Sequence, residues 1–159
     1  MSGLINSAGS RSGVIGTTEL DYEEGTWTPS YLSYTGSFTT MTMDRKDCRY
    51  VRIGNLVHIS ADIYTDVVTV GTASSLLYLG PLPFVTVNAR GCIPFTMVQN
   101  WASNVSPVSG YLPDNNDRMY IQKRATSAGD TSWSEVSSMT AGSSADKNHI
   151  VFAGSYSCN

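Results

Sequence analysis

The residues that could do chemistry in this chain of 159 residues are few and widely spaced. An enzyme needs a general base, a nucleophile with a partner, or metal ligands at usable spacing. His58 and His149 each lie in a stretch of alternating polar and apolar residues, where a hydrogen-bonded or surface imidazole is the ordinary role. Cys48 is flanked by basic residues that could activate a thiol, but no histidine is near it in sequence. We therefore expect an inert thiol, no catalytic residue and no enzymatic activity.

Two acidic groups could offer oxygen ligands to calcium, Asp21 with Glu23 and Glu24, and Asp114 with Asp117. Neither group lies in an EF-hand loop or a glycine-rich calcium repeat. Aspartate and asparagine stabilise tight turns by bonding their own backbone, so we expect the second group to form a turn. We expect the first group to be a solvated stretch before the first strand. The sequence therefore predicts no metal site and no cofactor.

The three cysteines, Cys48, Cys92 and Cys158, are an odd number, lie far apart and lack the spacing of zinc ligands. This pattern predicts free thiols, as in a protein assembled in a reducing cytoplasm.

The overall composition favours an all-β protein that does not bind nucleic acid or span a membrane. Only 14% of the residues are charged, against about 25% in an average soluble domain, and the chain has 22 Ser and 16 Thr. Serine and threonine suit exposed strand faces and turns better than surface helices. The net charge is −3, and the basic residues form no stripe. No apolar run approaches the roughly 20 residues of a membrane span, and the N-terminus lacks the charged region, apolar stretch and cleavage site expected of a secretion signal.

Short runs with the period of a half-buried strand begin at Thr26. In the first run, Gly25 allows the chain to turn, Trp27 points toward the core and Pro29 marks an edge strand. The clearest hairpin joins 49–53 to 56–64 through Gly54 and Asn55. The segment 76–84 holds two prolines and is expected to link strands. Further strands are expected over 91–98, 108–112, 119–124, 135–140 and 149–156, with turns at 113–117, 127–130 and 141–146.

These elements predict a single antiparallel β-sandwich over residues 21–159, plausibly a jelly roll. Residues 1–20 are rich in Gly and Ser and should form an extended N-terminal arm. The arm's apolar pairs, Leu4 with Ile5 and Val14 with Ile15, are candidate contacts with a partner. The alternative is a frayed terminus.

The aromatic residues are candidates for both the core and a contact surface. We expect Trp27, Tyr50 and Phe84 in the core. Trp101 and Trp133 lie among Ser, Asn and Gly, and we expect them on the surface or at a subunit boundary. A lectin or a carbohydrate-active enzyme that combines these two tryptophans with a nearby aspartate, Asp114 or Asp117, is an alternative function.

Four segments in order, DYEEGTWTP (21–29), CRYVRIGNLV (48–57), LPF (82–84) and IVFAGSY (150–156), resemble a domain of tailed-phage virion proteins. Such domains are frequent at the C-terminal end of tail fibres of phages of marine bacteria and cyanobacteria. The resemblance implies a β-sandwich that works as a homotrimer, contacts the host or the capsid and holds no cofactor.

The resemblance thus predicts a structural virion protein assembled in the host cytoplasm. In tail fibres the domain follows a long shaft, whereas here Met1 lies directly before the arm. This difference favours a capsid decoration (cement) protein, which would bind the major capsid protein on the outside of the head as a trimer and stabilise the shell. The alternative is a tail-fibre tip or small fibre subunit that contacts other tail or fibre proteins and recognises a host surface glycan.

Overall fold

The computed structural model describes residues 21–87, 90–102, 105–124 and 129–159. The expected arm, with Leu4, Ile5, Val14 and Ile15, lies outside these residues, as do residues 127 and 128 of the turn expected at 127–130. The described residues form strands β1 (Tyr22–Thr26), β2 (Ser30–Thr35), β3 (Thr40–Ile53), β4 (Leu56–Thr69), β5 (Ser74–Gly80), β6 (Gly91–Gln99), β7 (Ser106–Leu112), β8 (Met119–Arg124), β9 (Ser132–Trp133) and β10 (Gly142–Ser157), and the 3-10 helix η1 (Val136–Ser138).

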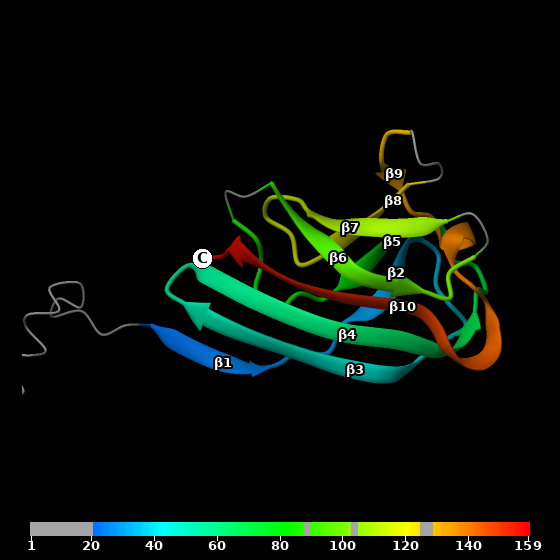
Figure 1. Cartoon of the computed structure of the whole chain (residues 1–159), viewed down its shortest axis with the longest axis horizontal. Coiled ribbons are helices and arrows are strands. Elements are labelled where there is room, and N and C mark those ends of the chain that lie inside the picture. Colours follow the sequence, from blue (N-terminus) through cyan, green and yellow to red (C-terminus); the bar gives the residue numbers. More distant parts are fainter. Residues whose placement is uncertain (1–20, 88–89, 103–104, 125–128) are drawn as a thin grey trace, which may run out of the picture.

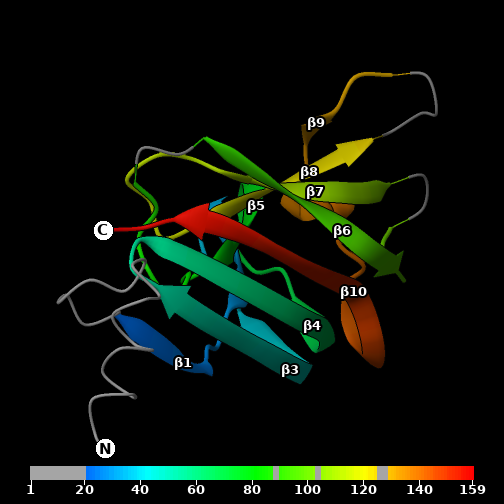
Figure 2. The ribbon, with the colours of Figure 1, turned by 60° about the vertical axis from the view of Figure 1, so that its left-hand side comes forward.

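The strands form one antiparallel sheet that curls strongly into a half-barrel (Figures 1 and 2). Its order is β1-β3-β4-β10-β6-β7-β8-β5-β2, and β9 pairs with β8. The all-β antiparallel fold predicted from the sequence is confirmed. Strands β1 and β2 are the two edges of the sheet, and Pro29 lies in the short link between them, where a missing backbone N–H interrupts no ladder.

Strand β6 connects the two halves of the sheet, because it pairs with a strand of each. Residues 91–94 pair with β7, whereas Phe95 and the residues that follow it pair with β10. Pro94 stands at the change of partner and has no N–H for a further ladder bond. The register with β10 also shifts between Val151 and Phe152, as expected where a strand bends between two layers.

The core lies between the two halves of the sheet, because each strand buries alternate residues. In β4, for example, Val57, Ile59, Ala61 and Ile63 are buried while the residues between them are exposed or half-buried. Fully burying one such side chain stabilises the fold by about 1.5–3 kcal/mol. The other half-sheet contributes Leu77, Leu79, Ile93, Leu112, Met119 and Ile121 to the same core.

The hairpin predicted around Gly54 and Asn55 is confirmed and is longer than expected. Strands β3 and β4 pair from Thr40 opposite Thr69 to Ile53 opposite Leu56. Gly54 has a φ of +57°, the left-handed conformation that favours glycine in a two-residue hairpin turn.

Two expectations near the acidic motif are wrong. The stretch that contains Glu23 and Glu24 is not solvated coil but the edge strand β1, which pairs with β3. Gly25 does not turn the chain: it lies in β1 opposite Tyr50, and a Cβ there would come within 2.9 Å of the Tyr50 hydroxyl. Gly25 therefore leaves room for the Tyr50 ring.

Three further boundaries differ from the sequence prediction. Residues 76–80 belong to strand β5, because the prolines of this segment follow the last paired residue, Gly80. The expected strand 135–140 contains η1, where a backbone bond from Ser138 to Glu135 replaces ladder pairing. Residues 142–146 of the expected turn 141–146 belong to β10, which absorbs the extra residues as register shifts against β4.

Candidate binding face

A row of aromatic side chains crosses the outer face of one half-sheet. Tyr78 of β5 lies opposite Tyr120 of β8, and Tyr120 lies opposite Tyr111 of β7. Partner residues of neighbouring strands project from the same face. Their strand neighbours Leu79, Ile121 and Leu112 are fully buried on the core side, so the three tyrosines project away from the core. Tyr78 is nevertheless covered, with 5% exposure.

Trp133 of β9 extends this row. It lies opposite Gln122 of β8, and its ring centroid is 5.4 Å from that of Tyr111 and 5.9 Å from that of Tyr120. Trp133 is 41% exposed, while the two tyrosines are half-buried. We call Tyr111, Tyr120 and Trp133 the aromatic patch. Such rings offer a large apolar area with polar tips, the combination common at binding surfaces.

Polar groups border the aromatic patch. The Arg118 guanidinium lies 4.7 Å from the ring centroid of Tyr78 and donates a hydrogen bond of 2.9 Å to its hydroxyl. The Ser109 hydroxyl donates to the Gln122 side-chain oxygen at 2.9 Å. Ser109 is itself buried, so a ligand on the patch would find the Arg118 guanidinium and the Gln122 amide on this face.

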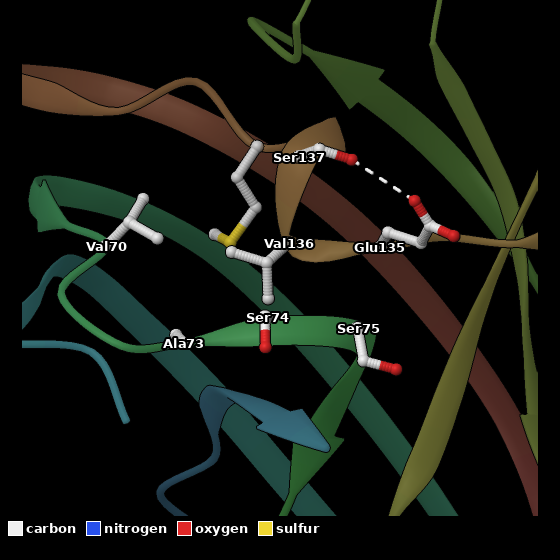
Figure 3. Close-up of a pocket in the computed structure, with 8 residues that line it drawn as sticks. Val70, Ala73, Ser74, Ser75, Glu135, Val136 and Ser137 are labelled. Carbon is white, nitrogen blue, oxygen red and sulfur yellow. Dashed lines mark hydrogen bonds between the residues drawn. The ribbon is translucent and has the colours of Figure 1, made fainter. Parts of the chain in front are cut away.

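A groove lies beside the patch, between the start of β5 and η1 (Figure 3). Its volume is about 380 Å³. The segment from Trp133 to Glu135 connects the patch and the groove. The side chains of Trp133 and Glu135 are exposed, while Ser134 between them is fully buried. The groove is lined by Val70, Ala73, Ser74, Ser75, Glu135, Val136, Ser137 and Met139.

The two tryptophans singled out in the sequence lie in different surroundings. Trp133 is exposed, as expected, and belongs to the patch. Trp101 is half-buried, packs against the core and stands edge-on to Tyr31 at 5.7 Å. Its indole N–H donates to the carbonyl of His149 at 3.1 Å, so its polar tip is already used within the chain. A contact role for either residue stays a prediction.

Of the three residues expected in the core, one is buried there and two are only half-buried. Trp27 is buried, with 6% exposure. Tyr50 and Phe84 are only half-buried and pack against the rim of the core, edge-on to each other at 5.3 Å. Arg52 covers Phe84, with its guanidinium carbon 4.9 Å from the ring centroid.

The histidines and cysteines form no reactive pair. His58 Nδ1 lies 3.0 Å from the Ser155 hydroxyl, and His149 Nε2 lies 2.8 Å from an oxygen of Asp62. All three cysteines are free, and Cys48 is buried. Burial raises the pKa of the Cys48 thiol to about 12, the reverse of the lowered pKa that a reactive thiol needs.

The acidic groups are also engaged elsewhere. The Tyr50 hydroxyl donates to Glu23 at 2.6 Å, and the Tyr22 hydroxyl donates to Glu24 at the same distance. The turn expected around Asp114 and Asp117 is confirmed: an oxygen of Asp114 accepts the N–H of the next residue at 3.0 Å. Within the described ranges, no group of three or more His, Cys, Asp or Glu side chains could hold a metal ion. No helix among the described residues is long and apolar enough to cross a membrane.

Sequence reasoning missed Tyr111, Tyr120 and Glu135 as site residues. Both tyrosines lie in strands that the sequence predicted, but their meeting depends on the register between β7 and β8. The pattern of residues within each strand does not specify which residues of the two strands lie opposite each other. An outward aromatic in each of two successive strands was the available signal.

Comparisons with known proteins show one clear structural similarity. No protein-family model and no curated protein sequence matches the chain. Among solved structures, the fold is similar to that of the Dettilon tailspike protein (gp208), with a TM-score of 0.63 and 20% sequence identity. The match covers 87% of this chain and 24% of the tailspike chain, so this chain spans about a quarter of that protein's length. The described domain therefore has a fold that also occurs within a tailspike.

Proposed function

We propose that this chain is a virion domain of a tailed phage that acts at the tail and recognises the host surface. The similarity of its fold to part of a tailspike is the observation that carries this proposal. It favours the tail alternative over the capsid decoration protein expected from the sequence, an expectation that depended on the predicted arm and on the position of Met1 directly before it. The ordered motifs at 21–29, 48–57, 82–84 and 150–156 agree with a virion domain of this kind.

The aromatic patch is the proposed contact with a host surface glycan. One face of a pyranose ring presents C–H groups, which pack on aromatic rings, while its edge presents hydroxyls that need hydrogen-bonding partners. Trp133 supplies an exposed ring, and Arg118 and Gln122 supply polar groups on the same face. This combination fits a sugar better than a wholly apolar ligand.

We expect binding without cleavage. Glycoside hydrolysis generally needs two carboxyl groups that flank the scissile bond about 5–10 Å apart. Among the lining residues of the groove, Glu135 alone carries a carboxylate. The homotrimer implied by the family resemblance also stays a prediction, which light scattering of the purified chain would test.

Whole-cell binding tests the proposed function. Labelled protein would be mixed with a panel of marine bacteria and cyanobacteria, each untreated, treated with periodate to oxidise glycans, or treated with protease. We expect binding to at least one strain, abolished by periodate and retained after protease treatment. Binding that protease abolishes and periodate spares would contradict a glycan ligand, and no binding to any strain that the source phage infects would contradict host recognition.

A further inference from the structure

The groove beside the aromatic patch combines one carboxylate, several hydroxyls and an apolar floor. We propose that it is a subsite for a sugar unit that carries a free, protonated amino group, which Glu135 binds. This inference rests on the proposed function, because it names the class of glycan that the same face would select.

Glu135 supplies the charge. Its carboxylate is exposed and accepts a hydrogen bond from the Ser137 hydroxyl at 3.3 Å, as the dashed line in Figure 3 shows. It forms no ion pair with any residue in the described part of the chain. Lys123, which contacts η1, donates to the Ser138 hydroxyl at 3.1 Å. The negative charge at the groove is therefore available to a cationic ligand.

The other lining residues suit a single sugar ring. Val70, Val136 and Met139 provide apolar side chains that can cover the C–H face of a pyranose. The volume of about 380 Å³ lies near the lower end of the roughly 300–1,000 Å³ of small-ligand sites, which fits one ring rather than a long chain.

Two serines of β5 add hydroxyl groups at the opposite wall from η1. Ser74 and Ser75 are both exposed and line the groove. Ser75 has a φ of +68°, a left-handed conformation that costs a residue other than glycine about 1–3 kcal/mol and is found more often at binding sites. The strained backbone of this serine is explained if its hydroxyl forms a hydrogen bond with a ligand in the groove.

The position of Glu135 also fits a neighbouring sugar unit on the patch. Trp133 lies two residues earlier on the same face, and two residues of extended chain span about 6.6 Å. Consecutive units of a glycan could therefore contact the Trp133 ring and the Glu135 carboxylate together.

Three trisaccharides with one backbone test this inference. The β-1,4-linked trimers of glucosamine, N-acetylglucosamine and glucose differ only in the group on carbon 2: ammonium, acetamide or hydroxyl. Titration calorimetry at mildly acidic pH and low salt should show the glucosamine trimer binding about tenfold more tightly than either neutral trimer, the effect of one charge-assisted hydrogen bond.

The substitution Glu135→Gln should remove this preference and leave the weaker binding of the neutral trimers unchanged. Glu24→Gln, which changes an exposed carboxylate on β1 away from the groove, is the matched control and should retain the preference. Thermal unfolding of both variants would verify that the fold is intact. Equal affinity for the three trimers, or a preference that survives Glu135→Gln, would overturn the inference.

The same variants separate this inference from the proposed function. If cells are bound through Trp133 but Glu135→Gln changes neither cell binding nor trimer preference, the amino-sugar subsite is wrong and glycan recognition by the patch stands. If the trimer preference depends on Glu135 but no host cell is bound, the subsite stands and the assignment to host recognition is wrong.

Discussion

Tyr111 on β7 and Tyr120 on β8 lie directly opposite each other, and Trp133 of β9 stands edge-on to both rings, at interplanar angles of 64° and 62°. The three rings come from separate strands, so the sheet register itself assembles the aromatic patch. Strands β7, β8 and β9, which carry the patch, lie on the other side of the molecule from the edge strand β1 (Figures 1 and 2). The aromatic patch can therefore be altered without disturbing the motif at 21–29.

The variant Trp133→Ala should weaken binding to host cells or their glycan by about tenfold or more, because truncating a central aromatic anchor typically costs about 2 kcal/mol or more. Its effect on stability should be small, since the side chain is 41% exposed. Cell-binding titration and thermal unfolding would measure the two effects. Tyr34→Ala is the matched control, because Tyr34 is 63% exposed on β2 and belongs to no aromatic pair in the described structure. Equal losses of binding in the two variants would speak against the patch.

The variant Gly110→Ala should destabilise the fold by about 1–3 kcal/mol, the usual cost of overpacking a core. A Cβ at Gly110 would clash with the buried side chain of Met119, which is fully enclosed and has little room to move. Gly91→Ala is the control, because the nearest atom to its Cβ would be 3.5 Å away, an ordinary contact. Urea unfolding would compare them, and a Gly110→Ala variant as stable as Gly91→Ala would show that the core is looser than described.

Ellman's reagent at neutral pH should modify one thiol in the folded protein and three after denaturation. Cys92 is exposed, whereas Cys48 and Cys158 are each only 2% exposed. The variant Cys92→Ser should leave no reactive thiol in the folded state. Because Cys92 lies opposite Tyr111, a glycan on the patch should slow the modification, and an unchanged rate under saturating ligand would place the ligand elsewhere.

Stability should fall as the pH rises from about 9 toward 12. The Cys48 thiol ionises near its usual pKa of 9.0 in the unfolded chain but only at about 12 when folded, because burial disfavours the thiolate. A raised folded pKa gives stability that is complete below the unfolded value and lost as the pH approaches the folded one. Burial also raises the pKa of Tyr31 well above its usual value, which adds loss in the same direction.

Urea unfolding at several pH values in this range would measure the slope. The variant Cys48→Ala removes one titrating group, so its stability should decline less steeply with pH than that of the parent protein. Parallel slopes would contradict the assignment to Cys48.

The elements predicted best are those set by neighbouring residues. The hairpin at Gly54 and Asn55 depends on a local turn, and the six residues of β8 match the predicted strand 119–124. Period-two alternation also placed Trp27 in the core correctly. In each case the signal lies within about ten residues of the element it predicts.

The elements missed depend on distant partners. Strand β1 exists because β3 offers it a ladder, and its carboxylates are satisfied by hydroxyls such as that of Tyr50. The aromatic patch needs the register of β7 against β8, and the groove needs η1 to lie against β5. Similarly, Trp101 is partly covered because its N–H reaches His149, 48 residues away. No local pattern reports such pairings.

The strongest test of a role at the tail is a map of the intact phage particle at residue resolution. We expect density for this chain on the tail, with Trp133 and the groove at Glu135 facing outward and accessible to a host cell. Density for the chain over the head shell, or an aromatic patch buried against another virion protein, would contradict it.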